Sequence, residues 1–181
     1  MKVISGNNEL HCAAYHEAGH AVAFYLLAHP INSIFVDDYG NGLVKGNVEV
    51  PTSKKNLSRK ELEKLMNQYG LRCLSGYAAE CKYRKINFLK VELISNENQN
   101  NDFSRLKNEM LKANEILQDD FFNDFWFYLI KDDVKKIMSR KKVKLVVEEL
   151  ALELIQNERK LISGERAIEI LSKHLICGEL S

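Results

Sequence analysis

The residues best suited to chemistry lie near the start of the chain, in the run His16-Glu17-Ala18-Gly19-His20. Histidines four residues apart on a helix project from one face, one turn above each other, so their imidazoles can bind the same zinc ion. Glu17 would lie about 100° around the helix from His16, where it can reach a water bound to the metal rather than the metal itself. The spacing therefore predicts His16 and His20 as metal ligands and Glu17 as a general base.

HExxH is a short pattern that also arises by chance on ordinary amphipathic helices, where the glutamate is simply solvated. The neighbouring residues favour the metal site, because small side chains let a second backbone approach the helix closely and shield a bound ion. These small residues are Ala13, Ala14, Ala18, Gly19, Ala21 and Ala23.

A third ligand must come from elsewhere in the chain, because the longer HExxHxxGxxH pattern is absent. His11, His29 and His174 are interpreted as ordinary histidines, with His29 at the end of the helix, just before Pro30. Cys12 lies one helical turn before the first motif histidine and is interpreted as a small buried thiol.

Length and composition indicate one globular domain over residues 1–181, with 45% hydrophobic residues and a formal net charge of +1. A near-neutral charge gives no reason to expect nucleic acid as a partner. No run approaches the roughly 18 apolar residues that a membrane span needs, and the first residues lack the apolar core of a signal peptide. The four scattered cysteines are expected to be reduced, and the expected compartment is the cytoplasm.

The motif is expected on a first helix over residues 8–28, which Pro30 ends. Two β-prone runs, 31–36 and 43–50, flank an Asp/Gly/Asn-rich segment and predict a β-hairpin or strand pair after this helix. That pair could hold a peptide substrate as an added strand, or it could be scaffold only.

The rest of the chain is helical in pattern. Ser58 and Glu61 resemble a capping box, which predicts a second helix running to about Tyr83. A short strand at 88–94, helices beginning near 102 and over 134–160 and 165–175, and an aromatic segment at 121–130 complete the expected elements. The fold class predicted is mainly α, with a small hairpin or short sheet.

Several stretches in order resemble the peptidase domain of the FtsH family of ATP-dependent zinc proteases. The motif helix, Ala14 to Val22, is similar to the zinc helix of that family. The other similar stretches are Leu27-Ala-His-Pro30, the G-x-A-A-E run within Leu74–Glu80, Asn101-Asp102-Phe103 at the start of a helix, and Leu161-Ile-Ser-Gly-Glu165.

The resemblance implies a mainly helical zinc metalloendopeptidase in which Asp102 is the third ligand and Glu80 supports the site from behind. An aspartate that opens a helix can instead be its N-cap, and Glu80 is then the next candidate ligand. The chain departs from the family in two respects. It contains no GxxxxGK[ST] ATPase motif and no membrane anchor, and an Asn-rich segment precedes Asp102.

Without an ATPase, the expected substrates are peptides and flexible or unfolded protein segments, unless a separate unfoldase delivers them. Two alternatives remain open: a small peptidase of the ImmA/IrrE type that cleaves one regulator, and a non-catalytic adaptor that binds zinc for structure. An aromatic cluster exceeds what one helix face can bury and suggests a homo-oligomer or partner surface beside core packing. It comprises Phe121, Phe122, Phe125, Trp126, Phe127 and Tyr128.

Overall fold

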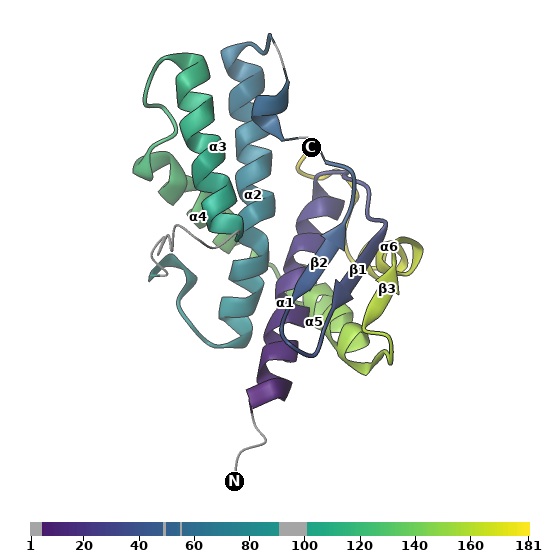
Figure 1. The fold of residues 1–181 in the computed structure, drawn as a ribbon. Helices are drawn as coiled ribbons and strands as arrows, with labels where there is room; N and C mark the ends of the chain where they lie inside the picture. The colour runs from purple at the N-terminus through teal and green to yellow at the C-terminus, as the bar shows by residue number, and fades with distance from the viewer. Residues whose placement is uncertain (1–4, 49, 55, 91–100) are drawn as a thin grey trace.

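The structure is a computed structural model that describes residues 5–48, 50–54, 56–90 and 101–181. Helices dominate it, and a small antiparallel sheet lies at one side (Figure 1). The elements in chain order are α1 (Ser5–Leu26), β1 (Ser33–Val36), β2 (Gly42–Lys45), the 3-10 turn η1 (Pro51–Ser53), α2 (Arg59–Tyr83), the 3-10 turn η2 (Phe88–Lys90), α3 (Asp102–Leu117), α4 (Asp124–Ser139), α5 (Lys141–Gln156), β3 (Leu161–Ser163) and α6 (Gly164–Ser172).

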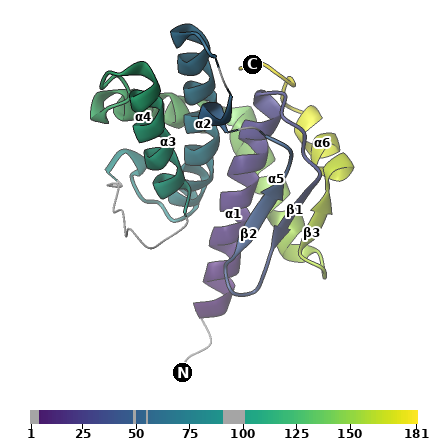
Figure 2. The same ribbon diagram turned by 45° about the horizontal axis from the view of Figure 1, so that its top comes forward.

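Helix α1 is the central element, and it packs against α2, α5 and the sheet (Figures 1 and 2). Its small residues make this possible, as the sequence predicted. A side chain at Gly19 would place its Cβ 2.7 Å from the Cβ of Ala79 and even closer to the carbonyl oxygen of Ser75. Ala14, Ala18 and Ala21 are completely buried, since α2, α5 and the sheet together cover α1.

The sheet has the strand order β2-β1-β3 with antiparallel pairing throughout. The predicted strand pair is confirmed as β1 and β2, joined by a turn in which Asp37 accepts from the backbone N–H groups of Tyr39 and Asn41. Strand β3 pairs Leu161 with Phe35 on the far side of β1. One edge of β2 is therefore left unpaired within the sheet.

The predicted fold class, mainly α with a short sheet, is confirmed. Helix α2 begins at the predicted capping box, because the Ser58 side chain accepts from the Glu61 N–H while the Glu61 carboxylate accepts from the Ser58 N–H. The three-residue strand β3 was not predicted, since strand pairing between distant segments leaves little trace in so short a run.

Two predicted elements are wrong. The single helix predicted over 134–160 is two helices, α4 and α5, which meet at Arg140 in an extended backbone conformation. The break lets α4 pack against α2 while α5 packs against α1, so tertiary packing overrides local helix propensity. The predicted strand at 88–94 begins instead with the 3-10 turn η2, and positions 91–94 lie outside the described residues.

The aromatic cluster divides between the core and the surface. Phe122, Trp126 and Phe127 are buried, whereas Phe125 and Tyr128 are 69% and 55% exposed. Core packing thus explains half of the cluster. Over the described ranges, no helix combines the length and apolar character needed to cross a membrane.

Candidate metal centre

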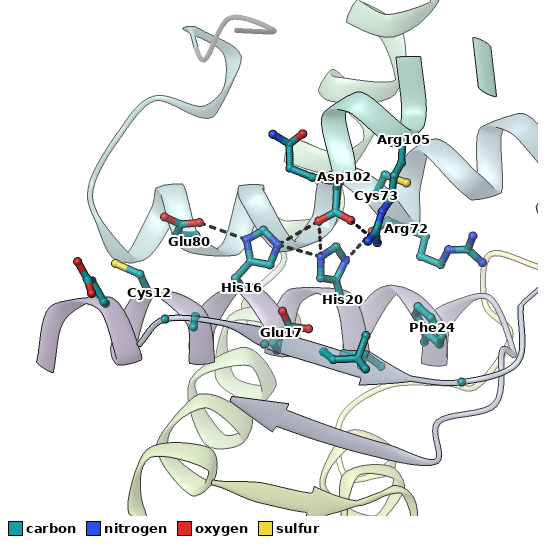
Figure 3. A pocket seen from close by; sticks show the side chains of 18 of the residues that line it. Cys12, His16, Glu17, His20, Phe24, Arg72, Cys73, Glu80, Asp102 and Arg105 are labelled. Carbon is teal, nitrogen blue, oxygen red and sulfur yellow. Dashed lines mark hydrogen bonds and ion pairs between the residues drawn. The ribbon is translucent and has the colours of Figure 1, made fainter. Parts of the chain in front are cut away.

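Three side chains converge on one point between α1 and α3 (Figure 3). The Nε2 atoms of His16 and His20 are 2.9 Å apart, and each faces Oδ2 of Asp102, at 3.2 Å and 3.0 Å. One ligand atom from each residue lies within 4.8 Å of the others. The structure therefore brings together the three residues that the sequence suggested as metal ligands.

The hydrogen-bond partners of the two Nδ1 atoms determine the tautomer of each imidazole. Nδ1 of His20 lies 2.8 Å from the carbonyl oxygen of Arg72, which can only accept, so this nitrogen carries the hydrogen. Nδ1 of His16 lies 3.2 Å from the carboxylate of Glu80 and likewise donates. When neutral, both imidazoles therefore turn an Nε2 lone pair toward the carboxylate of Asp102. Three lone pairs that meet are the donor set of a metal ion.

The electrostatics of the cluster agree with this geometry. Burial alone would lower the pKa of His16, but its contacts with Asp102 and Glu80 outweigh burial and raise the pKa to about 10. Burial alone would raise the pKa of Asp102, but the two imidazoles hold it well below its usual range. The cluster thus stabilises positive charge where its three ligand atoms converge.

Asp102 is available as a ligand because it is not the N-cap of its helix. The cap of α3 is Asn101, whose side-chain oxygen accepts from the N–H of Ser104 at 2.9 Å. The interpretation of Asp102 as an N-cap is therefore wrong. Its carboxylate, at the first position of α3, points out of the helix toward the two histidines (Figure 3).

Glu80 lies behind the site rather than in it. Its Oε2 accepts from His16, and its Oε1 accepts from the Arg84 guanidinium at 2.8 Å. Burial would raise the pKa of Glu80, but these two contacts lower it. The carboxylate fixes the ring orientation and tautomer of His16, as carboxylates behind metal-bound histidines commonly do.

Glu17 lies on the adjacent face of α1, between this helix and β2 (Figure 3). It is 6% exposed. A Cβ at Gly42 would lie 2.7 Å from Oε1 of Glu17, so β2 approaches the carboxylate closely because a glycine stands there. Burial raises the pKa of Glu17, partly offset by the neighbouring imidazoles and by the N–H of Val44. A buried carboxylate of this kind accepts protons more readily than a solvated one.

A second glycine, Gly76, permits a close approach at the metal-ligand group itself. Gly76 of α2 faces the two imidazoles, and a Cβ there would lie 2.7 Å from Nε2 of His16 and closer still to that of His20. The structure shows that what approaches is the pair of ligand rings.

The remaining candidates do not join the cluster. His11 contacts the hydroxyl of Tyr83, and His29 lies beside the ring of Phe24. Cys12 is partly buried at the rim and contacts the side chain of Asn8. His174 is partly buried beyond the site. The expectation that none of these is a ligand agrees with the metal-ligand group formed by the described residues.

The cluster opens into a cleft of about 820 Å³. One wall contains Asp102, Tyr69 and Arg72, and the opposite wall is formed by β2. The edge of β2 that pairs with no other described strand thus borders the cleft, and the Val44 N–H of this strand donates to Glu17.

Comparison with known proteins adds no relative. No family model matches the sequence, and no curated protein is significantly similar to it.

Proposed function

We propose that this chain is a zinc-dependent metalloendopeptidase that hydrolyses peptide bonds in flexible or unfolded protein segments. The observation that carries the proposal is the convergence of His16, His20 and Asp102 in an open cleft that also contains a buried acid, Glu17. A structural zinc site is normally closed by four protein ligands. Three ligands beside an open cleft leave one coordination position for a substrate.

Zinc suits this donor set, since two imidazole nitrogens and a carboxylate oxygen with an open position are typical of catalytic zinc. When bound, zinc would act as a Lewis acid toward a carbonyl group and would acidify water. The role of Glu17 follows from its place in the cleft. Its carboxylate takes a proton from the attacking water and delivers that proton to the nitrogen of the leaving amine.

The edge of β2 supports a substrate in extended conformation. A peptide that adds to this edge gains backbone hydrogen bonds without a requirement for particular side chains. Such an extended strand is available in flexible or unfolded segments and not in a folded domain. The resemblance to the FtsH family supports the same substrate class, and a separate unfoldase would widen it to folded proteins.

The decisive experiment compares the wild type with Glu17→Gln, both loaded with zinc. Glutamine keeps the shape of the side chain but is a far weaker base, so turnover of unfolded casein should fall by about 10²–10⁴-fold while zinc content is unchanged. Equal turnover by both proteins would contradict the role of Glu17, and no turnover by the zinc-loaded wild type would support the adaptor alternative. Cleavage of one regulator at one site, with casein untouched, would support the ImmA/IrrE-type alternative.

A further inference from the structure

One arginine of the cleft has an unusual environment. The guanidinium carbon of Arg72 lies 4.8 Å from the ring centroid of Tyr69 and 5.6 Å from that of Phe24. Both aromatic residues are buried, and all three residues line the cleft. Figure 3 shows Arg72 and Phe24 there. The two rings restrict where the long side chain can go, so the charge is held in place beside the metal-ligand group.

The other two arginines of the cleft each face a carboxylate. Arg84 pairs with Glu80 at 2.8 Å, and Arg105 lies 3.8 Å from Asp102. In the described part of the chain, no carboxylate lies within 4.0 Å of the guanidinium of Arg72. Burial lowers the pKa of this side chain. The hydrogen bond with Tyr69 and the more distant charge of Asp102 offset the effect of burial only in part, and a ligand that brings a negative charge into contact would relieve the remaining cost.

The position of the Arg72 guanidinium can be given along α1, because Arg72 contacts two residues of that helix. The backbone carbonyl of Arg72 accepts from Nδ1 of His20, while its guanidinium lies near Phe24, one helical turn further along. One turn is about 5.4 Å, and an extended peptide advances roughly 3.3 Å per residue. A peptide bond held at the metal-ligand group would therefore have an adjacent residue within reach of Arg72.

We propose that Arg72 is a specificity residue that binds a carboxylate of the substrate next to the scissile bond. This inference rests on the proposed peptidase function. Tyr69 takes one hydrogen bond of the guanidinium. A planar guanidinium has five N–H donors and can hold a carboxylate through two parallel N–H···O bonds. The carboxylate comes from an aspartate or glutamate side chain or from the C-terminus of the peptide.

The test uses blocked peptides, acetylated and amidated, in which one glutamate or one glutamine is moved through the two positions on each side of the scissile bond. Zinc-loaded wild type should prefer glutamate at one position by a factor on the order of 10–100 in kcat/KM. In Arg72→Met that ratio should fall to about 1. The glutamine peptide is the internal reference for each protein, so a general change in activity cancels in the ratio.

Two further variants complete the test. Arg159 is exposed and outside the cleft, so Arg159→Met should keep the wild-type ratio. Arg72→Lys keeps the charge but loses the planar fork, so it should show a reduced preference, and it replaces Arg72→Met if that variant does not fold. A glutamine peptide with a free C-terminus is compared with its amidated form. If the free form is cleaved faster, and only when Arg72 is present, the terminal carboxylate is the ligand.

The inference is overturned by a wild-type ratio near 1 for every blocked peptide together with no preference for a free C-terminus, or by preferences that are unchanged in Arg72→Met. Failure of the peptidase function is separable from this result. Calorimetric titration of the glutamate and glutamine peptides into the zinc-loaded Glu17→Gln variant, with and without Arg72→Met, needs no cleavage. Preferential binding of glutamate that depends on Arg72 supports the carboxylate site even without hydrolysis, and equal binding of both peptides rejects it.

Discussion

Asn101 caps helix α3 and leaves the carboxylate of its neighbour, Asp102, directed at the candidate metal centre. The Asn101 side chain accepts from the Ser104 N–H at 2.9 Å, whereas Oδ2 of Asp102 lies 3.0 Å and 3.2 Å from the two imidazoles. The capping role and the ligand role that the sequence suggested for one residue are thus divided between two.

This division makes the ligand role separable from helix stability. Asp102→Asn should greatly weaken zinc binding, because a neutral amide is a poorer ligand for a divalent cation, while the cap of α3 is untouched. Asn101→Ala is the matched control and should cost about 0.5–2 kcal/mol of stability with zinc retained. Zinc titration and thermal melting of the metal-free proteins distinguish the two, and full zinc affinity in Asp102→Asn would reject the ligand assignment.

Gly76→Ala should abolish zinc binding even though it changes no ligand. The added Cβ would lie 2.7 Å from Nε2 of His16, so the rings must leave the positions in which their lone pairs converge. Gly70→Ala on the same helix is the control, since its Cβ would meet Cγ2 of Ile130 at 2.9 Å, away from the site. It should lower the melting temperature but keep zinc. Equal zinc content in the two variants would contradict the arrangement described.

Glu80→Ala should reduce zinc affinity by about 10–100-fold without eliminating it, because its carboxylate orients His16 but does not bind the metal. Glu63→Ala serves as control, since Glu63 is on the same helix and pairs only with the partly exposed Arg59 in the described contacts. Competition with a chromophoric chelator measures both affinities. Complete loss of zinc from Glu80→Ala would instead make Glu80 a ligand.

Removal of the metal should destabilise the protein as well as inactivate it. A ligand that binds only the folded state stabilises it by about 4 kcal/mol at a free concentration 1,000 times its Kd. Dialysis against 1,10-phenanthroline should therefore lower the melting temperature and stop proteolysis, and added zinc should restore both. Identical melting with and without chelator, in protein shown to have contained zinc, would contradict this expectation.

Local signals accounted for much of the fold. The capping box at Ser58 and Glu61 gave the start of α2, and the spacing of His16 and His20 gave their common helix face. The break at Arg140 was missed because no proline or glycine marks it. Strand β3 was missed because its pairing with Phe35 depends on residues more than a hundred positions away in the chain.

The residues of the candidate site likewise include some that local sequence signals predicted and some that they did not. The motif on α1 identified two ligands and the acid, because all three lie within one and a half turns of a single helix. Asp102 was reached only through the order of motifs that resemble a known family. The orienting carbonyl of Arg72 was not predicted at all, because every residue has a carbonyl and only the packing of α2 on α1 determines which one meets His20.

Metal binding at the candidate centre would also affect the entropy of the unfolded chain. His20 and Asp102 are 82 positions apart, so an ion shared between them is a cross-link that closes a long loop. By analogy with a disulfide across a loop of similar length, such a closure lowers the entropy of the unfolded chain by the equivalent of about 4–5 kcal/mol. The same ion that would polarise a substrate would thus also fasten α3 to α1.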